Sequence, residues 1–390
     1  MRILHISDCY LPRLGGIETQ VHALAVVQRA AGHAAEVLTA TPRGRHDLTR
    51  SEVIDGVPVH RATADLPFEL PVHPRAGREV ARVLDAGPWD AVHVHTGVVS
   101  PFAYAALPVV VGRRLPLVVT VHSLWGYAAP GLRLLQAATG WARWPVVWTA
   151  VSDVAAGPVR RAAGPGVPVG VLPNGIDAAR WRVDPLPRDP DDVLLVAVMR
   201  LAPRKRPLPL LRILDRVRAT VPTGVRVRVE IAGAGPQRPA MERHLRRHGG
   251  DAWVRLRGRL TPDELRELYR RADVFVAPAR LESFGIAALE ARTAGLPVVA
   301  MAGTGIGEFV RPPDEGILAG SDAAMAAALA RLAADPAARA RIAAHNRSVT
   351  PTVTWPDVLR RGEDAYRLAA ARAAAARPAS GAGGARRDAG

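Results

Sequence analysis

The sequence contains a single cysteine, Cys9, so an internal disulfide is excluded and a reducing compartment is expected. We interpret Cys9 as a small apolar residue at a strand end rather than as a nucleophile. No uninterrupted apolar run has the roughly 20 residues that a membrane-spanning helix needs. The segment from Met1 to Ser7 turns polar too soon for a signal peptide. We therefore expect a cytoplasmic protein, with peripheral attachment to the inner face of the plasma membrane left open.

Aromatic residues make up only 5% of the chain, and no nucleic-acid-binding motif is present, so nucleic acid is not an expected partner. The net charge is +16, and arginine dominates the basic side. Such an excess either reflects a genome of high GC content or indicates attraction to polyanions, namely nucleotide diphosphates or acidic lipid head groups.

The length of 390 residues favours two domains. Short apolar runs alternate with helical patterns in both halves, which is typical of βαβ units in an α/β fold. The expected strands are 2–7, 37–39, 92–94, 117–121, 150–152 and 169–172, and then 193–199, 225–232, 254–256, 274–277 and 296–300. Helices are expected at 262–271, 322–344 and 355–374, a linker at 185–190 and a disordered tail at 377–390.

Gly15 and Gly16 separate the first strand from a helix that is expected from Ile17 to about Ala31. Glycine lets the backbone approach a ligand closely at such a turn, although an ordinary tight turn explains the pair equally well. The pair lacks the G-x-G-x-x-G spacing of dinucleotide-binding proteins, so a nicotinamide enzyme is not indicated.

Two expected strands of the first half end at histidines, His95 and His122. Ligands of open α/β sheets bind at the carboxyl ends of the strands. His122 is therefore either a satisfied strand-end histidine or a ligand to sugar hydroxyls or phosphate. His93 and His95 share one face of a strand, as a metal pair does, but no third ligand follows at a suitable spacing, so no metal site is predicted.

Three tryptophans, Trp141, Trp144 and Trp148, recur at helical spacing, with Arg133 and Arg143 nearby. The pattern predicts a helix that packs on the domain and partly lines an acceptor groove. A helix at a membrane interface is the alternative.

The stretch from Glu282 to Glu290 organises the second half of the chain. Ser283, Phe284 and Gly285 stand where a helix is expected to begin, and free backbone N–H groups at a helix start bind phosphate. Glu290 falls on an apolar stripe of that helix, so it needs a basic partner or the hydroxyls of a ligand. A phosphate site beside a hydroxyl acceptor suggests a nucleotide that carries a sugar.

A basic cluster follows the strand expected at 193–199 and contains Arg200, Arg204, Lys205 and Arg206. Cations at the carboxyl end of a strand can clamp phosphates. A solvated loop is the alternative interpretation.

From Arg2 to about Tyr366, the sequence resembles a retaining glycosyltransferase of family 4 with the GT-B fold. The most specific motif is Glu282-x7-Glu290 with its Ser-Phe-Gly. Support comes from Gly15-Gly16-Ile17-Glu18, from Arg200 followed by Lys205, from Pro173-Asn174-Gly175-Ile176-Asp177 and from the turn Gly233-Ala234-Gly235. One departure is the loop Gly303-Thr304-Gly305-Ile306-Gly307-Glu308, where the family has Gly-Gly-x-x-Glu. We expect this loop to be flexible.

The resemblance implies two Rossmann-like, doubly wound α/β domains that face each other across a cleft. Residues 1–184 would form the acceptor side, 185–192 a linker and 193–354 the nucleotide-sugar domain. A helix at 355–375 would cross back to the first domain, before a disordered tail at 376–390.

The same resemblance implies the roles of individual residues. Arg200 and Lys205 would neutralise the diphosphate, Glu290 would accept the ribose hydroxyls, and Glu282 would sit at the donor sugar. The implied catalytic residues are His122, Glu282, Arg200 and Lys205. The implied donor-binding residues are Gly15, Gly16, Arg200, Lys205, Gly258, Arg259, Glu282, Ser283, Phe284, Gly285, Ile286 and Glu290. The implied acceptor-side residues are Tyr10, Glu18, His95 and Asn174, and neither a cofactor nor a metal is implied.

We thus expect the transfer of a mannosyl, glucosyl or N-acetylglucosaminyl group from a UDP- or GDP-sugar to a hydroxyl acceptor. A lipid-linked or cell-envelope acceptor, and contact with an anionic membrane, are candidates. One alternative is a nucleotide-sugar epimerase, which would move a C2 proton without an acceptor. Another is a non-catalytic carbohydrate-binding scaffold, against which the intact basic pair and carboxylates argue.

Overall fold

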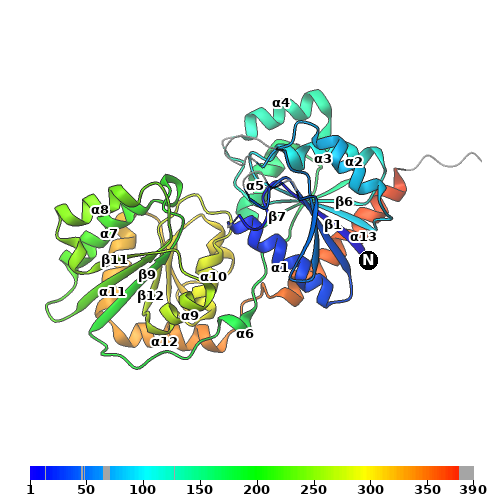
Figure 1. The fold of residues 1–390 in the computed structure, drawn as a ribbon. Helices are drawn as coiled ribbons and strands as arrows, with labels where there is room; N and C mark the ends of the chain where they lie inside the picture. Colours follow the sequence, from blue (N-terminus) through cyan, green and yellow to red (C-terminus); the bar gives the residue numbers. More distant parts are fainter. Residues whose placement is uncertain (14, 45–46, 48, 65–70, 127, 377–390) are drawn as a thin grey trace, which may run out of the picture. The chain divides into compact units, whose positions relative to one another are not determined.

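The computed structural model describes residues 1–13, 15–44, 47, 49–64, 71–126 and 128–376. It divides the chain into two compact units, each an α/β unit built on one sheet (Figure 1). The first unit contains 1–151, 156–172 and the chain from Leu359 onward, and the second contains 152–155 and 173–358. The segment 173–184, which we expected in the first domain, therefore belongs to the second. The expected disordered tail at 377–390 lies outside the described residues.

The sheet of the first unit has the strand order β3-β4-β2-β1-β5-β6-β7-β8. Its strands are β1 (Arg2–Ser7), β2 (Ala34–Thr39), β3 (Ser51–Ile54), β4 (Val57–Arg61), β5 (Ala91–Thr96), β6 (Leu117–Val121), β7 (Val146–Ala150) and β8 (Val169–Val171). All neighbouring strands are parallel except β3, which pairs antiparallel with β4. The helices are α1 (Gly16–Ala30), α2 (Ala76–Asp85), α3 (Pro101–Gly112), α4 (Ala129–Thr139) and α5 (Asp153–Ala163), of which the first three residues of α5 belong to the second unit. The crossover from β1 to β2 runs opposite to that from β5 to β6, so right-handed crossovers place α1 and α3 on opposite faces.

The hairpin of β3 and β4 and the helices α2 and α3 were not among the expected elements. The hairpin turns at Asp55 and Gly56, which both have positive φ. This is the backbone that a two-residue hairpin turn requires, and Asp-Gly is its usual sequence.

The tryptophan stretch does not form the expected single helix. Trp141 opens a short 3₁₀ turn, whereas Trp148 lies on the buried strand β7. The rings of Trp141 and Trp148 contact each other edge to face, with centroids 4.7 Å apart. These two side chains therefore build a core and do not line a groove.

The sheet of the second unit is entirely parallel, in the order β11-β10-β9-β12-β13-β14. Its strands are β9 (Asp192–Val198), β10 (Arg226–Ala232), β11 (Val254–Gly258), β12 (Val274–Ala277), β13 (Val298–Met301) and β14 (Gly316–Ala319). Its helices are α6 (Ala178–Trp181), α7 (Pro207–Thr220), α8 (Arg238–Arg247), α9 (Pro262–Arg271), α10 (Ile286–Thr293), α11 (Asp322–Ala334) and α12 (Pro336–Ser348). The helix that was expected at 322–344 is thus two helices, because Asp335 caps the second and Pro336 opens it.

The last helix, α13 (Trp355–Ala375), begins in the second unit and continues in the first. Its Ala365, Tyr366 and Ala369 pack against Ile3, Ala91, Val118 and Val147 of the first sheet. The chain leaves the first unit along residues 173–177 and returns along 353–355, and these two segments lie side by side. They meet at an isolated bridge between Ile176 and Thr354. Among the described residues, no helix is long and apolar enough to cross a membrane.

Candidate functional site

The strand order of the second sheet reverses between β9 and β12, and open α/β sheets bind ligands at such a switch point, beyond the carboxyl ends of the strands. The two basic residues singled out in the sequence, Arg200 and Lys205, follow β9. Glu282 and Ser283 follow β12. The fold therefore gathers at one edge the two motifs that lie far apart in the sequence.

Lys205 and Glu282 form an ion pair across this switch point, with side chains that are 23% and 14% exposed. Arg200 is exposed. Arg206 has a different task, because it donates two hydrogen bonds to the Asp322 carboxylate, at 3.0 and 2.7 Å, and one to the Pro278 carbonyl at 3.0 Å. It braces the loop after β9 against the loop after β12 and so holds Lys205 near Glu282.

Two glycines after β10 allow its loop to run directly along the loop after β9. A Cβ atom on Gly233 would lie 1.8 Å from the carbonyl oxygen of Met199, and one on Gly235 would lie 2.4 Å from that of Leu201. Gly258 ends the edge strand β11 with positive φ, and its carbonyl accepts the N–H of Gly233. Arg259, the next residue, is exposed.

The glycine loop after β13, which we expected to be flexible, contains a short helical turn. Its residues Gly305–Glu308 form a 3₁₀ turn, and Gly305 N–H donates to the Glu282 carbonyl at 3.0 Å. A Cβ atom on Gly305 would lie 2.2 Å from the Ser283 carbonyl oxygen. The turn thus packs directly on the backbone of the Glu282 motif.

The helix after the motif begins at Ile286 rather than at Ser283. Gly285 is its N-cap residue, with φ of 96°, and no side chain caps the helix. The Phe284 side chain is buried, and its ring lies 5.3 Å from that of Phe309. Uncapped N–H groups in the first turn of α10 therefore lie at the switch-point edge, where they can bind an anion.

Glu290 lies on α10, beside Tyr269 of α9 and Arg180 of α6. Burial raises the pKa of Glu290 to about 8, and the charge of Arg180 opposes this shift only in part. The pKa of Tyr269 is raised as well, first by burial and then by Glu290. A carboxylate in this setting gains most from a ligand that donates hydrogen bonds to it.

In the first unit, the glycine pair marks the start of α1. Gly15 is its N-cap residue, in extended conformation, and Gly16 is its first residue. A Cβ atom on Gly15 would lie 2.4 Å from a carboxylate oxygen of the buried Glu18. Gly15 therefore lets the carboxylate of Glu18 lie directly against the start of α1.

Three expected acceptor-side residues have other surroundings. Tyr10 is fully buried, and its hydroxyl lies 2.7 Å from Nδ1 of His22, so it is a core residue. His95 lies inside β5, which ends at Thr96, and it is 2% exposed. Asn174 is buried in the second unit. Direct contact of Tyr10 or His95 with an acceptor does not fit this burial.

The histidine pair of β5 does have a third neighbour, which spacing along the chain could not reveal. His5 of β1 joins His93 and His95, and one ring nitrogen from each lies within 4.8 Å of the others. Every ring nitrogen of these three residues already has a hydrogen-bond partner in the structure. Hydrogen bonding thus accounts for the cluster as it stands.

Asp189, Pro190 and Asp191 form an Asp-x-Asp sequence, and two such carboxylates can hold a divalent cation. Because it precedes β9, it lies at the amino end of the strand, away from the switch-point edge. Asp189 accepts hydrogen bonds from the Arg226 side chain at 2.7 Å and from Asp191 N–H at 3.0 Å.

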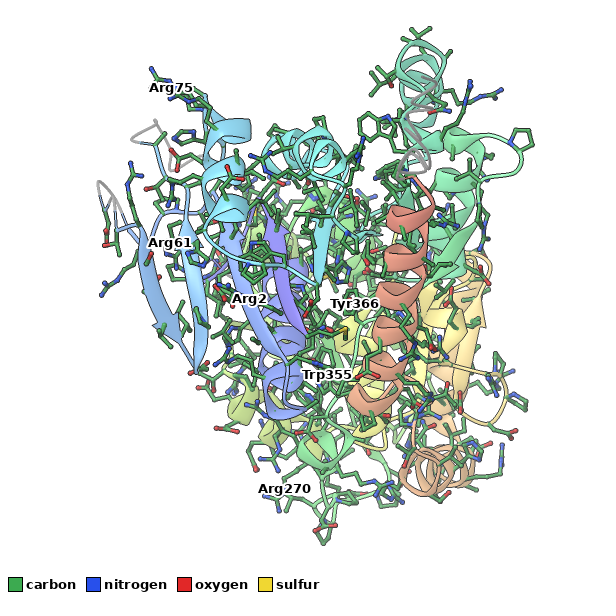
Figure 2. All side chains as sticks on the ribbon, turned by 90° about the vertical axis from the view of Figure 1, so that its right-hand side faces the viewer. Arg2, Arg61, Arg75, Arg270, Trp355 and Tyr366 are labelled. Atoms are coloured by element: carbon green, nitrogen blue, oxygen red, sulfur yellow. The ribbon has the colours of Figure 1, made fainter. Side chains whose placement is uncertain are left out.

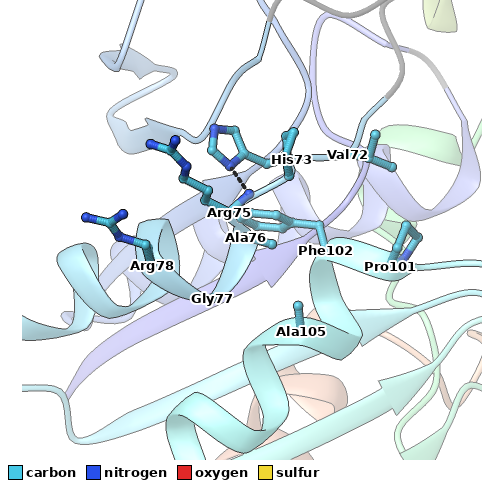
Figure 3. A pocket seen from close by; sticks show the side chains of 10 residues that line it. Val72, His73, Arg75, Ala76, Gly77, Arg78, Pro101, Phe102 and Ala105 are labelled. Atoms are coloured by element: carbon cyan, nitrogen blue, oxygen red, sulfur yellow. Dashed lines mark hydrogen bonds between the residues drawn. The ribbon is translucent and has the colours of Figure 1, made fainter.

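A pocket of about 490 Å³ lies in the first unit, between the start of α2 and the start of α3 (Figure 3). None of the residues singled out in the sequence lines it. Phe102 and Ala105 of α3 form one wall, while Arg75 and Arg78 extend to one side of the view in Figure 3. The first turn of α3 is capped by Asp8, which accepts N–H groups of Phe102 at 2.9 Å and Ala103 at 3.3 Å. Burial raises the pKa of Asp8 to about 6.

Both halves of the chain match known family models. Residues 14–180 match the model described as Glycosyltransferase Family 4, and residues 182–349 match the one described as Glycosyl transferases group 1.

Among curated proteins, a glycogen synthase of Mycobacterium tuberculosis is 32% identical over 389 residues, with 92% of each chain covered. A D-inositol 3-phosphate glycosyltransferase of Acidothermus cellulolyticus is 30% identical, with 88% of this chain and 84% of the relative covered. Among solved structures, Anabaena Alr3699/HepE in complex with UDP superposes with a TM-score of 0.72 at 19% identity, over 93% of this chain and 99% of that one.

Replacing Gly305 with alanine should destabilise the second unit by about 1–3 kcal/mol, because the new methyl group meets backbone atoms of Ser283 that cannot move aside cheaply. Gly307→Ala is the matched control in the same turn, since its Cβ would lie 3.4 Å from the side chain of Leu318. Urea unfolding of both variants measures the difference. Equal midpoints would show that the turn does not pack as described.

Replacing Glu290 with glutamine should stabilise the protein, and the gain should depend on pH. The pKa of Glu290 is about 8 in the folded protein against an ordinary value of 4.5. Wild-type stability therefore falls as pH rises between these two values and is level above them. The difference between the two melting temperatures should grow from near zero at low pH to a plateau above pH 8, where it corresponds to about 5 kcal/mol in the free energy of unfolding.

The control for this pH series is Glu267→Gln on α9, which removes an exposed carboxylate paired with Arg270 at 2.9 Å. Its melting temperature should follow that of the wild type at every pH. A Glu290→Gln difference that is constant with pH would contradict the raised pKa.

Proposed function

The chain belongs to glycosyltransferase family 4, with the GT-B fold, and from that premise we propose that it transfers a hexosyl group from a UDP- or GDP-sugar to a hydroxyl acceptor, with retention of configuration. The observation that carries the proposal is the ion pair of Lys205 and Glu282 at the switch point, beside the uncapped start of α10. One edge then offers cations and N–H groups to a diphosphate and carboxylates to sugar hydroxyls.

The phosphates would be bound by Arg200, Lys205 and the first N–H groups of α10. Charge that develops on the leaving diphosphate is best stabilised by donors already in place, because they need no reorganisation during the reaction. The brace from Arg206 to Asp322 keeps Lys205 in such a place. UDP is the ligand of Alr3699/HepE, which shares the fold.

Glu290 would accept the ribose hydroxyls. In the free protein the pKa of this carboxyl is raised by burial. Two hydroxyl groups that donate to Glu290 would favour its charged form and so lower its pKa. Glu282 would bind the donor sugar, and its ion pair with Lys205 would hold the carboxylate in place for that contact.

The reaction we propose is a displacement on one face of the sugar. The bond from the anomeric carbon to the diphosphate oxygen breaks as the bond to the acceptor oxygen forms. The acceptor's proton passes to the leaving diphosphate, which departs with the electron pair of the broken bond. No covalent enzyme intermediate and no metal ion are required.

We propose that the pocket between α2 and α3 holds an anionic group of the acceptor. Arg75 and Arg78 supply positive charge at its rim, and Phe102 and Ala105 supply an apolar wall. One relative is named for D-inositol 3-phosphate, a molecule that carries a phosphate. An acceptor with a phosphate or carboxylate would fit this lining better than a neutral glycan.

The donor is identified by a thermal-shift screen with UDP-, GDP- and ADP-sugars, because a ligand that binds only the native state raises the melting temperature. With that donor, Lys205→Ala should lower kcat/KM by about 100-fold, the typical cost of removing one donor to a developing charge. Arg212→Ala, which removes an exposed cation on α7, is the control and should leave the rate unchanged.

Near-normal turnover by Lys205→Ala would refute the phosphate-clamp assignment. Incubating the donor without any acceptor and analysing the sugar by NMR tests the epimerase alternative. Detection of an epimerised sugar would show that the function is epimerisation and not transfer.

The double variant Arg75→Ala/Arg78→Ala should raise the KM for a phosphorylated acceptor by about 10-fold, with kcat and the donor KM unchanged, because it removes exposed cations. Arg82→Ala is the control on the same helix, since Arg82 pairs with Glu79 at 3.0 Å. Initial rates over a series of salt concentrations measure the effect. Equal KM values for the double variant and the control would show that the pocket does not bind the acceptor.

A further inference from the structure

One face of the first sheet changes from apolar to polar side chains along its strands. Near the strand starts it is apolar and packs on α13 through Ala365, Tyr366 and Ala369. Two residues further along the same face, the side chains are His5, His93, Thr120 and Thr149, and His95 follows. All five are buried. Tyr366 lies on α13 (Figure 2), and its hydroxyl is 2.9 Å from Nδ1 of His93 in this polar row.

A continuous chain of hydrogen bonds runs through these side chains. It starts at the Val119 carbonyl, which is 3.0 Å from the Thr149 hydroxyl. Thr149 is 2.7 Å from Thr120, and Thr120 is 2.7 Å from Nε2 of His93. Nδ1 of His93 is then 2.9 Å from the Tyr366 hydroxyl. The last helix is thereby connected to the centre of the sheet.

The chain continues from Tyr366 through Gln28 of α1. The Gln28 amide nitrogen is 2.9 Å from the Tyr366 hydroxyl, and its oxygen is 2.6 Å from Nε2 of His5. Nδ1 of His5 is 3.0 Å from Nε2 of His95. Nδ1 of His95 is 3.0 Å from Nε2 of His122, which follows β6. The chain thus ends at the residue that we singled out as a ligand.

The four histidines are neutral in this setting. Burial lowers the pKa of His5 and of His122 to about 4, and those of His93 and His95 well below the ordinary value. Each neutral ring has one N–H donor and one acceptor nitrogen. Each hydrogen bond of the chain has one proton between its two heavy atoms. The donor in one bond therefore fixes the donor in the next.

The carbonyl of Val119 sets the direction of the first part of the chain, because a carbonyl can only accept. Thr149 must donate to it, so Thr120 must donate to Thr149, and Nε2–H of His93 must donate to Thr120. Nδ1 of His93 is then the acceptor, and the Tyr366 hydroxyl donates to it.

Through Gln28, the donors of the first part also fix the donors of the second part. Its amide nitrogen donates to Tyr366, so its oxygen accepts from Nε2–H of His5. Nδ1 of His5 then accepts from His95, and Nδ1 of His95 accepts from Nε2–H of His122. The reverse assignment would leave one buried oxygen–oxygen or nitrogen–oxygen contact without a proton, which is costly.

We propose that Tyr366 and Thr149 are positioning residues that hold His122 in the Nε2–H tautomer, with Nδ1 as its hydrogen-bond acceptor. Any group that bonds to Nδ1 must then be a donor. Of the two ligand types left open for His122, a sugar hydroxyl fits and a phosphate oxygen does not. The preference for a sugar hydroxyl at Nδ1 rests on the proposed function, whereas the assignment of the tautomer does not.

The wild-type protein provides the first test, because it needs no variant. Long-range ¹H–¹⁵N NMR spectra of protein labelled with ¹⁵N-histidine distinguish Nε2–H from Nδ1–H rings, and single substitutions assign the signals. His5, His93, His95 and His122 should all carry the proton on Nε2. A proton on Nδ1 of His122 would overturn the proposal, whether or not the protein transfers sugar.

Variants test the positioning. Thr149→Val and Tyr366→Phe remove hydroxyls from the chain, so the His122 signals should shift toward a mixture of tautomers. Thr149→Ser keeps the hydroxyl and should restore the wild-type spectrum. With the donor found by the screen, kcat should fall on the order of tenfold in the first two variants and recover in the third, as for residues that orient a functional ligand. The KM for the donor should stay unchanged.

Two results would refute the positioning role. One is an unchanged His122 tautomer in both Thr149→Val and Tyr366→Phe. The other is a kcat loss that Thr149→Ser fails to restore although the protein melts at the wild-type temperature. If the wild type transfers no sugar but shows the expected tautomers, the proposed function fails and the positioning of His122 stands.

Discussion

Parallel sheets are buried on both faces, and this constraint governs where each unit can place polar groups. A polar side chain is tolerated at the carboxyl edge, where strands give way to loops, or in the interior if every hydrogen bond is made. The second unit uses the edge, where Lys205 and Glu282 meet across the switch point. The first unit also uses the interior, where a row of histidines and threonines is linked end to end.

Most strands could be predicted from the sequence, because strands of a sheet that is buried on both faces appear as apolar runs. The strand β6 and the helix α9 begin and end at the residues expected from such patterns. The pattern failed at Trp148, since helical spacing of aromatic residues does not distinguish a helix from a turn followed by a strand. It failed again for β3 and β4, where the signal at Asp55 and Gly56 was present but was not used.

The site could be predicted only as far as its residues are neighbours in the sequence or belong to a family motif. Glu282 and Lys205 came from such motifs, and the fold brings them together. The helical turn at Gly305 could not be foreseen, because it depends on backbone contact with Ser283, from another part of the chain. Tyr366 and Gln28 carry no motif, and only the packing of α13 and α1 on the first sheet reveals them.

The lowered pKa of His122 bears on which group can take up the acceptor's proton. A histidine whose pKa is held near 4, as in His122, is a weak base, and general-base catalysis is most effective when the pKa lies near the working pH. In the role that we propose, His122 would orient a hydroxyl through Nδ1, but it would take up the hydroxyl's proton only at a large energetic cost. The chain behind it would have to accept a charge in a buried row of neutral groups. In the transfer that we propose, the proton of the acceptor would therefore pass to the departing diphosphate, whose charge Lys205 and the start of α10 would stabilise.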